Sequence, residues 1–235
     1  LPTPAADGGL MQLRTDRYGA LAPSIPVRHA LAREGSYYSF FNATLDVATT
    51  EAGHAAPVLA DIDATLVKAA IFFRNISSST TKGWHLDWLK LHVKTAGATG
   101  SSILYHAQVG TTTRLSTGGV ALTVTQPNMG AANDASSLLT AQTGPIVITA
   151  ENATTRNVMQ GLIRDGIEVA GDTKTFIFGA EPLGTSNGEL AAGTHDIIHM
   201  PPVFLPSGAE FILGLAQVGQ NAPGVYGVSG GMYYR

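Results

Sequence analysis

Two histidines four residues apart are the strongest candidates for metal chemistry in this sequence. The segment His195-Asp-Ile-Ile-His199 has the spacing of two zinc ligands that lie one helical turn apart. Here the acid directly follows the first histidine, and Pro201-Pro202 ends any helix just beyond His199. The segment is therefore predicted to be a strand, on which the two side chains would be separated by roughly 13 Å of rise. We predict no metal site and no cofactor.

Other acids and histidines could provide hydrolytic chemistry. His85 and Asp87 share a strand face by alternation, but no Gly-x-Ser-x-Gly nucleophile elbow accompanies them. Asp61 and Asp63 lack the spacing and the following glycine of a calcium-binding loop, so they are interpreted as polar loop or edge-strand residues. We therefore predict that the protein is not an enzyme and has no catalytic residues.

The composition is poor in charge. Charged residues make up 13% of the chain, about half of the usual share, and a net charge of −3 provides no excess of cations for nucleic acid. No apolar run approaches the roughly 20 residues of a membrane-spanning helix, so we expect no contact with nucleic acid or membrane. The absence of cysteine is compatible with assembly in a reducing cytoplasm. Small neutral residues, including 27 glycines, suit close contacts between subunits, which predicts a component of an assembly.

The first 35 residues differ from the rest of the chain. They contain several prolines and no sustained period of 2 or 3.6, which predicts an extended arm over residues 1–35 and a β-domain over residues 36–235. Such an arm is expected to be ordered by a neighbouring subunit; the alternative is a disordered tail with solvated side chains. Charged groups on a neutral surface can fix the register of a contact. The predicted partner-contacting residues of the arm are Arg14, Asp16, Arg17 and Tyr18.

Short runs of β-branched and aromatic residues recur after residue 35, between clusters of turn-forming residues. This pattern predicts an all-β fold, an antiparallel β-sandwich of jelly-roll or Greek-key type. The predicted strands cover residues 37–42, 69–75, 84–94, 103–110, 120–125, 145–150, 174–180, 195–205, 210–216 and 225–234.

Three local features refine this prediction. The apolar face of the run over residues 84–93 changes near Trp88, which predicts a bulge or a change of sheet there. Two helical turns are predicted for residues 135–142, with Asp134 as the N-cap. Residues 155–165 are predicted to be a strand or irregular.

Aromatic doublets occur at four places, and in a strand one ring of each doublet faces each side of the sheet. One ring is therefore expected in the core, and the other is available to a second surface. A contact between subunits is the favoured use of that surface, and a sugar-binding platform is the alternative. The doublets are Tyr37-Tyr38, Phe40-Phe41, Phe72-Phe73 and Tyr233-Tyr234.

Several segments together resemble small β-sandwich virion proteins of tailed bacteriophages. The arm carries Arg14-Thr-Asp-Arg-Tyr-Gly-Ala20, and the first strand follows as Gly35-Ser-Tyr-Tyr-Ser-Phe-Phe41. Ala69-Ala-Ile-Phe-Phe-Arg-Asn75 then precedes the strand that begins at Trp84. Pro201-Pro-Val-Phe-Leu-Pro-Ser-Gly208 leads into the last strands, and the chain closes on Arg235. The resemblance covers most of the chain and implies a capsid decoration or cement protein, or another minor head or tail component.

This resemblance implies partners and a location. The expected partners are the major capsid protein and other virion proteins, in a particle assembled in the cytoplasm of a bacterial host. We expect a non-enzymatic protein that binds the outside of the capsid, associates with itself as a trimer and bridges neighbouring capsid subunits. The alternative is a tail or fibre component that recognises glycans on the host surface.

Overall fold

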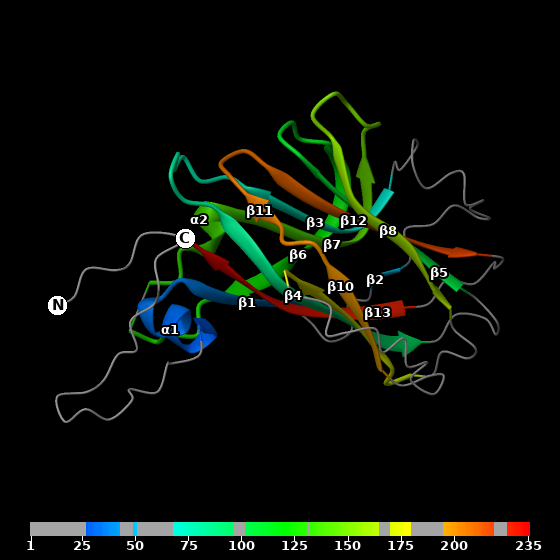
Figure 1. Cartoon of the computed structure of the whole chain (residues 1–235), viewed down its shortest axis with the longest axis horizontal. Coiled ribbons are helices and arrows are strands. Elements are labelled where there is room, and N and C mark those ends of the chain that lie inside the picture. The colour runs from blue at the N-terminus through cyan, green and yellow to red at the C-terminus, as the bar shows by residue number, and fades with distance from the viewer. Residues whose placement is uncertain are drawn as a thin grey trace, which may run out of the picture.

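The computed structural model describes residues 27–42, 49–50, 68–95, 102–130, 132–164, 170–179, 195–218 and 225–235 (Figure 1). Two helices occur in these ranges, α1 (Val27–Glu34) and α2 (Ala135–Leu138), and no helix in the described part is long and apolar enough to cross a membrane. The strands are β1 (Tyr37–Asn42), β2 (Thr49–Thr50), β3 (Lys68–Asn75), β4 (Trp84–Thr95), β5 (Ser102–Gly110), β6 (Leu115–Thr125), β7 (Leu139–Ile148), β8 (Arg156–Arg164), β9 (Thr173–Phe178), β10 (His195–Met200), β11 (Phe204–Leu205), β12 (Glu210–Val218) and β13 (Val225–Tyr234).

The strands follow a jelly-roll order. Their hydrogen-bonded path runs β10-β9-β4-β13-β1-β6-β7-β3-β12-β5-β8, with β11 on β4 and β2 on β13. Within this path, β1-β13-β4-β9 form one four-stranded sheet and β3-β12-β5-β8 form the other. Counted along the chain, these eight strands have the order 1-8-3-6 in the first sheet and 2-7-4-5 in the second, which is the arrangement of a jelly roll.

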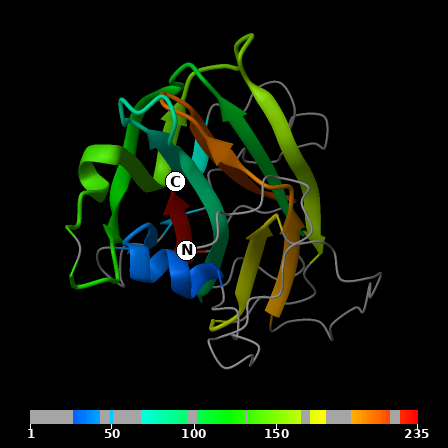
Figure 2. The same ribbon diagram turned by 60° about the vertical axis from the view of Figure 1, so that its left-hand side comes forward.

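The hairpin β6–β7 joins the two sheets along one side (Figures 1 and 2). The last residues of β6, from Leu122 to Thr125, pair with β1, while its earlier residues pair with β7. Gly118 and Gly119 lie at a register shift within β6 and have φ angles of 84° and 85°. Glycine adopts this backbone conformation without strain, so the strand can bend from one sheet into the other.

Inward-facing side chains of both sheets form the main core. Phe40 of the first sheet packs edge-to-face on Phe73 of the second, with ring centroids 4.9 Å apart, and Phe73 stacks on Phe211. A second, smaller cluster lies on the other side of β3 and β7, where Phe72 is fully buried with Ile146. The expectation that each aromatic doublet leaves one ring accessible is therefore wrong for Phe72-Phe73, because both faces of β3 are covered.

The predicted all-β sandwich is confirmed, and each predicted strand coincides at least in part with an observed one. The predicted bulge near Trp88 is also confirmed, because the register of β4 against β13 shifts between Leu86 and Trp88. Residues 155–165, predicted to be a strand or irregular, contain the strand β8.

Three expectations are corrected. Residues 27–34 form α1 instead of extended backbone, and Leu31 of this helix is buried. The helix over residues 135–142 ends at Leu138, because Leu139 and Ala141 alternate into the core as the start of β7. The strands β9 and β10 pair in parallel, unlike the antiparallel pairing expected throughout.

Candidate functional site

The partner-contacting residues predicted in the arm, Arg14, Asp16, Arg17 and Tyr18, lie outside the described residues. The first described element after these residues along the chain is α1, which lies beside β1 (Figure 1).

The candidate site is the solvent side of the sheet formed by β10, β9, β4, β13 and β1. Residues directly opposite each other on neighbouring strands point to the same face, so the registers define three rows of side chains on this side. We call these rows the outer aromatic face. The rows are Phe204, His85, Tyr233 and Tyr37; then His199, Ile177, Trp88 and Gly231; then Ile197, Thr175, Lys90, Ser229 and Phe41.

His85 lies between two aromatic rings in the first row. Its imidazole stacks on Tyr233, with ring centroids 4.6 Å apart and planes 7° apart. Phe204 lies on the other side of the imidazole, at 4.7 Å between centroids. Burial lowers the pKa of His85, and the cation of Arg235 lowers that pKa further. Near pH 7 the ring is therefore neutral and extends the apolar surface of its neighbours.

A hydrogen-bonded corner joins α1 to this face. Arg28 of α1 binds the carboxylate of Asp87 through two nitrogen atoms, at 2.6 and 2.7 Å. The hydroxyl of Tyr37 donates to the same carboxylate at 2.9 Å and accepts from the indole Nε1 of Trp88 at 3.0 Å. Burial and the charge of Asp87 raise the pKa of Tyr37 to about 12, so the phenol remains a donor throughout the neutral range.

The bulge in β4 and a glycine in β13 make this corner possible. Leu86 lies opposite Met232 and Trp88 lies opposite Gly231, so Asp87 is the additional residue of the bulge. A Cβ atom on Gly231 would approach the Tyr37 hydroxyl and lie 2.6 Å from the indole nitrogen of Trp88. Only glycine leaves this space open.

The periphery of the outer aromatic face is the most accessible part. Ile197 is 54% exposed, Phe204 is 49% exposed and Phe41 is 42% exposed. These three apolar side chains come from β10, β11 and β1, so the accessible surface extends across the whole width of the sheet. Large exposed apolar areas on a folded protein mark sites of interaction.

Charge is scarce on the same face. Asp87 is paired with Arg28. Among the described side chains of the three rows, Lys90 is the one that carries a formal charge, and it has no ion-pair partner among the described residues. His92, further along β4, hydrogen-bonds the hydroxyl of Ser229 at 3.0 Å. Burial lowers the pKa of His92, and Lys90 lowers that pKa further. At pH 7 the face is thus close to neutral.

Within the described ranges, the histidines and acids that the sequence analysis considered for metal binding or hydrolysis are not brought together into one site. His199 lies on strand β10, as predicted for the segment that begins at His195. His85 and Asp87 have separate partners, since His85 stacks on rings and Asp87 binds Arg28. The described ranges hold no group of three or more potential metal ligands, and Asp61 and Asp63 lie outside them.

A buried polar network, which the sequence did not indicate, lies on the other sheet. The carboxylate of Glu210 accepts from the backbone N–H of Arg114, at 3.2 and 3.1 Å, and both residues are fully buried. The Arg114 guanidinium donates to Gln108, and Gln108 donates to Asn157. Burial raises the pKa of Glu210, although the N–H of Arg114 and the cation of Arg74 oppose this effect. These contacts connect β12, β5 and the start of β8.

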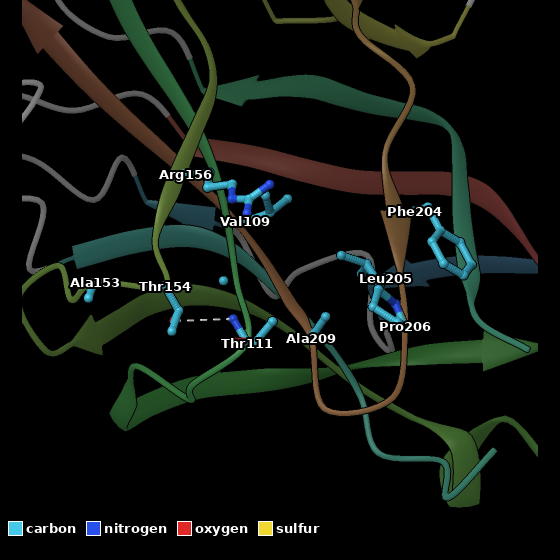
Figure 3. Close-up of a pocket in the computed structure, with 10 residues that line it drawn as sticks. Val109, Thr111, Ala153, Thr154, Arg156, Phe204, Leu205, Pro206 and Ala209 are labelled. Atoms are coloured by element: carbon cyan, nitrogen blue, oxygen red, sulfur yellow. Dashed lines mark hydrogen bonds between the residues drawn. The ribbon is translucent and has the colours of Figure 1, made fainter. Parts of the chain in front are cut away.

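A cleft of about 380 Å³ lies next to this network (Figure 3). Arg156 and Val109 lie on one side of it, and Leu205 and Pro206 lie on the other. The Phe204 ring points away from the cleft, to the far side of β11. Among the described residues, the guanidinium of Arg156 has no ion-pair partner.

Comparison of the chain with protein-family models, with curated proteins and with solved structures gives no match in any of the three. The fold and the surface chemistry of the molecule are therefore the observations from which a function can be inferred.

Alternation within strands could locate part of the outer aromatic face in advance. The doublets Tyr37-Tyr38 and Phe40-Phe41 each place one ring in the core and one on this face, as predicted. The participation of His85, Trp88 and Ile197 depends on which strands are neighbours. That order is a property of the fold, and the sequence pattern does not contain it.

Proposed function

We propose that the protein is a non-enzymatic structural protein of a bacteriophage virion, which binds the outside of the capsid and bridges neighbouring capsid subunits. The observation that carries this proposal is the outer aromatic face, an accessible apolar sheet surface with very little charge. Such a surface is suited to burial against another folded protein.

The fold supports the same proposal. Jelly rolls occur in viral capsid proteins, as well as in lectin domains and cupins. Fold analogy alone does not define a function, but it agrees with the resemblance of the segments around Tyr37, Phe72 and Trp84 to phage virion proteins.

In this proposal, the arm is attached to the sandwich through α1. The ion pair between Arg28 and Asp87 holds α1 against the sheet, so the 26 residues before α1 start from a fixed position. An extended segment of 26 residues can span up to roughly 85 Å, which would allow it to contact a neighbouring subunit. Repetition of such contacts over a lattice gives high avidity from modest single contacts.

Co-sedimentation with assembled capsids tests the proposal. We expect the full chain to sediment with shells at a fixed stoichiometry. A chain that lacks residues 1–26 but keeps α1 is expected to remain folded, by circular dichroism, and to lose most of its binding. A full chain that stays in the supernatant at every concentration would refute the capsid-binding role, and undiminished binding of the truncated chain would refute the role of the arm.

A second candidate function rests on the cleft at Arg156. The Arg156 guanidinium, which has no ion-pair partner within the described ranges, lies beside the polar residues Thr111 and Thr154 and can bind a carboxylate. The volume of the cleft is sufficient for one sugar unit. This arrangement favours a tail or fibre protein that recognises acidic glycans. Titration with glucuronate, followed by NMR, tests it: shifts at Arg156 that disappear in Arg156→Gln support this function, and the absence of any saturable shift rejects it.

A further inference from the structure

We propose that the outer aromatic face is where two copies of this chain bind each other about a two-fold axis, and that protonation of histidines on the face separates them. This inference rests on the proposed structural role, because it names the first partner of the same surface. It replaces the trimer expected from the sequence with a dimer. Three observations support it, namely the size of the face, its charge and its histidines.

The size of the face is appropriate for one specific contact. Five neighbouring strands at about 4.8 Å spacing, followed over the length from His85 to His92, cover a flat area of roughly 500 Å². The accessible surface is larger than this rectangle because side chains stand out from it. A standard interface uses about 800 Å² on each partner, which is of the same order.

The charge of the face favours a second copy as the partner. The face carries the Arg28–Asp87 ion pair and Lys90, a net charge of +1, so two identical faces fit together only if each Lys90 lies beside an acid of the other copy. In a two-fold contact the same patch is used on both copies. An axis that crosses β4 between Asp87 and Lys90, perpendicular to the strand, places Lys90 of each copy opposite Asp87 of the other.

This axis also brings the apolar groups together. Trp88 lies between Asp87 and Lys90 on β4, so it occupies the centre of the contact, where aromatic residues contribute most to binding. Ile197 and Phe41 lie on opposite sides of β4, from the strands β10 and β1 of the third row. The contact therefore covers accessible apolar groups on both sides of its centre.

Histidines make the contact sensitive to pH. His85 is a member of the first row, and His92 continues β4 beyond Lys90. Each is neutral when deprotonated, and each adds a positive charge when protonated.

The charged and titratable groups around these histidines do not compensate for that charge. His85 faces Tyr233 and the cation of Arg235, and His92 faces Lys90. The hydrogen-bond partner of His92 on β13 is the hydroxyl of Ser229. Among the described side chains of this face, the acid is Asp87, which binds Arg28 and, in the two-fold contact, also faces Lys90 of the other copy. Acidification therefore adds like charges to both halves of the contact, which separates the copies.

Sedimentation velocity of the purified full chain tests this inference. We expect twice the chain mass at pH 7.5 and the mass of one chain at pH 5.0. Ile197→Lys changes a side chain that is 54% exposed and is expected to weaken the dimer at least tenfold without affecting the fold. Met129→Lys is the matched control, because Met129 is 97% exposed and lies outside the face. Its dimer is expected to be unchanged.

Two further variants test the arrangement of charges and the pH response. Lys90→Glu places two acids opposite each other and is expected to abolish the dimer, whereas Lys82→Glu, in the connection between β3 and β4, leaves it intact. The variant His92→Gln is expected to remain dimeric to a lower pH than the native chain.

The outcomes separate this inference from the proposed function. A native chain that is monomeric or trimeric at pH 7.5, or an Ile197→Lys variant that dimerises as the native chain does, overturns the two-fold contact. If such a chain still sediments with capsids, the structural role stands without the dimer. A dimer that never binds capsids overturns the structural role alone.

Discussion

Gly231 shows how one residue without a side chain organises the outer aromatic face. Tyr37, Trp88 and Asp87 come from two strands and a bulge, and they meet because β13 leaves room for them at this glycine. The hydrogen bonds from Trp88 to Tyr37 and from Tyr37 to Asp87 both lie over this point. The geometry of the corner is therefore sensitive to a single methyl group.

A pair of glycine substitutions on β13 tests this sensitivity. Gly231→Ala places a methyl group against Tyr37 and Trp88 and is expected to lower the free energy of unfolding by about 1–3 kcal/mol, the usual cost of overpacking. Gly227→Ala on the same strand meets no atom closer than 3.8 Å, and its effect is expected to stay within about 0.5 kcal/mol. Urea unfolding measures both, and equal effects of the two substitutions would contradict the argument.

Glu210 predicts a pH dependence of stability. Because burial raises the pKa of its carboxyl in the folded state, folding favours the protonated form. The stabilisation that Glu210 contributes is fully present when the pH is below the pKa of this carboxyl in the unfolded chain. It is lost as the pH rises through the pKa of the carboxyl in the folded chain.

The variant Glu210→Gln removes this titration. The free energy of unfolding of the variant minus that of the native chain is therefore expected to increase from pH 4 to pH 7, measured by urea unfolding at each pH. Glu34→Gln, on the surface of α1, provides the control difference. A difference for Glu210→Gln that is constant or falls over this range would show that its pKa is not raised.

At the scale of elements, alternation of apolar residues was sufficient to find most strands and one irregularity. The bulge at Asp87 follows from the change of apolar face near Trp88, which is local information. The helix α1 was missed because one buried side chain, Leu31, and one ion pair to a distant strand fix it to the sheet, and neither produces a periodic pattern. The parallel pairing of β9 and β10 likewise depends on the connection between them.

The attachment of α1 can be tested by proteolysis. Asp87→Asn removes the charged partner of Arg28 and weakens the acceptor of Tyr37, so α1 is expected to separate from the sheet more often. Tryptic cleavage after Arg33, in the last turn of α1, is then expected to be several-fold faster than in the native chain. High salt screens an exposed ion pair, so it is expected to accelerate cleavage of the native chain more than that of the variant. Equal cleavage rates would mean that other contacts hold the helix.

At the scale of the whole molecule, the jelly-roll order is the feature that the sequence does not contain. The runs around Tyr37, Trp84 and Phe211 predict strands and their faces, but nothing within them specifies that β13 lies between β1 and β4. The outer aromatic face is a consequence of that order. Its position could therefore be inferred only after the topology, although its aromatic and apolar composition was visible in the doublets.

The continuity of β6 predicts how the molecule unfolds. Because β6 pairs with β1 of one sheet and with β7 next to the other, neither sheet can lose this strand without exposing the shared core. We expect circular dichroism and tryptophan fluorescence to follow one unfolding transition, as in two-state behaviour. Leu122→Ala, at the point where β6 changes sheet and where Leu122 is buried, is expected to shift both curves together and to reduce stability by about 2–4 kcal/mol. Separation of the two curves, in either chain, would mean that the sheets unfold independently and that the hairpin does not couple them.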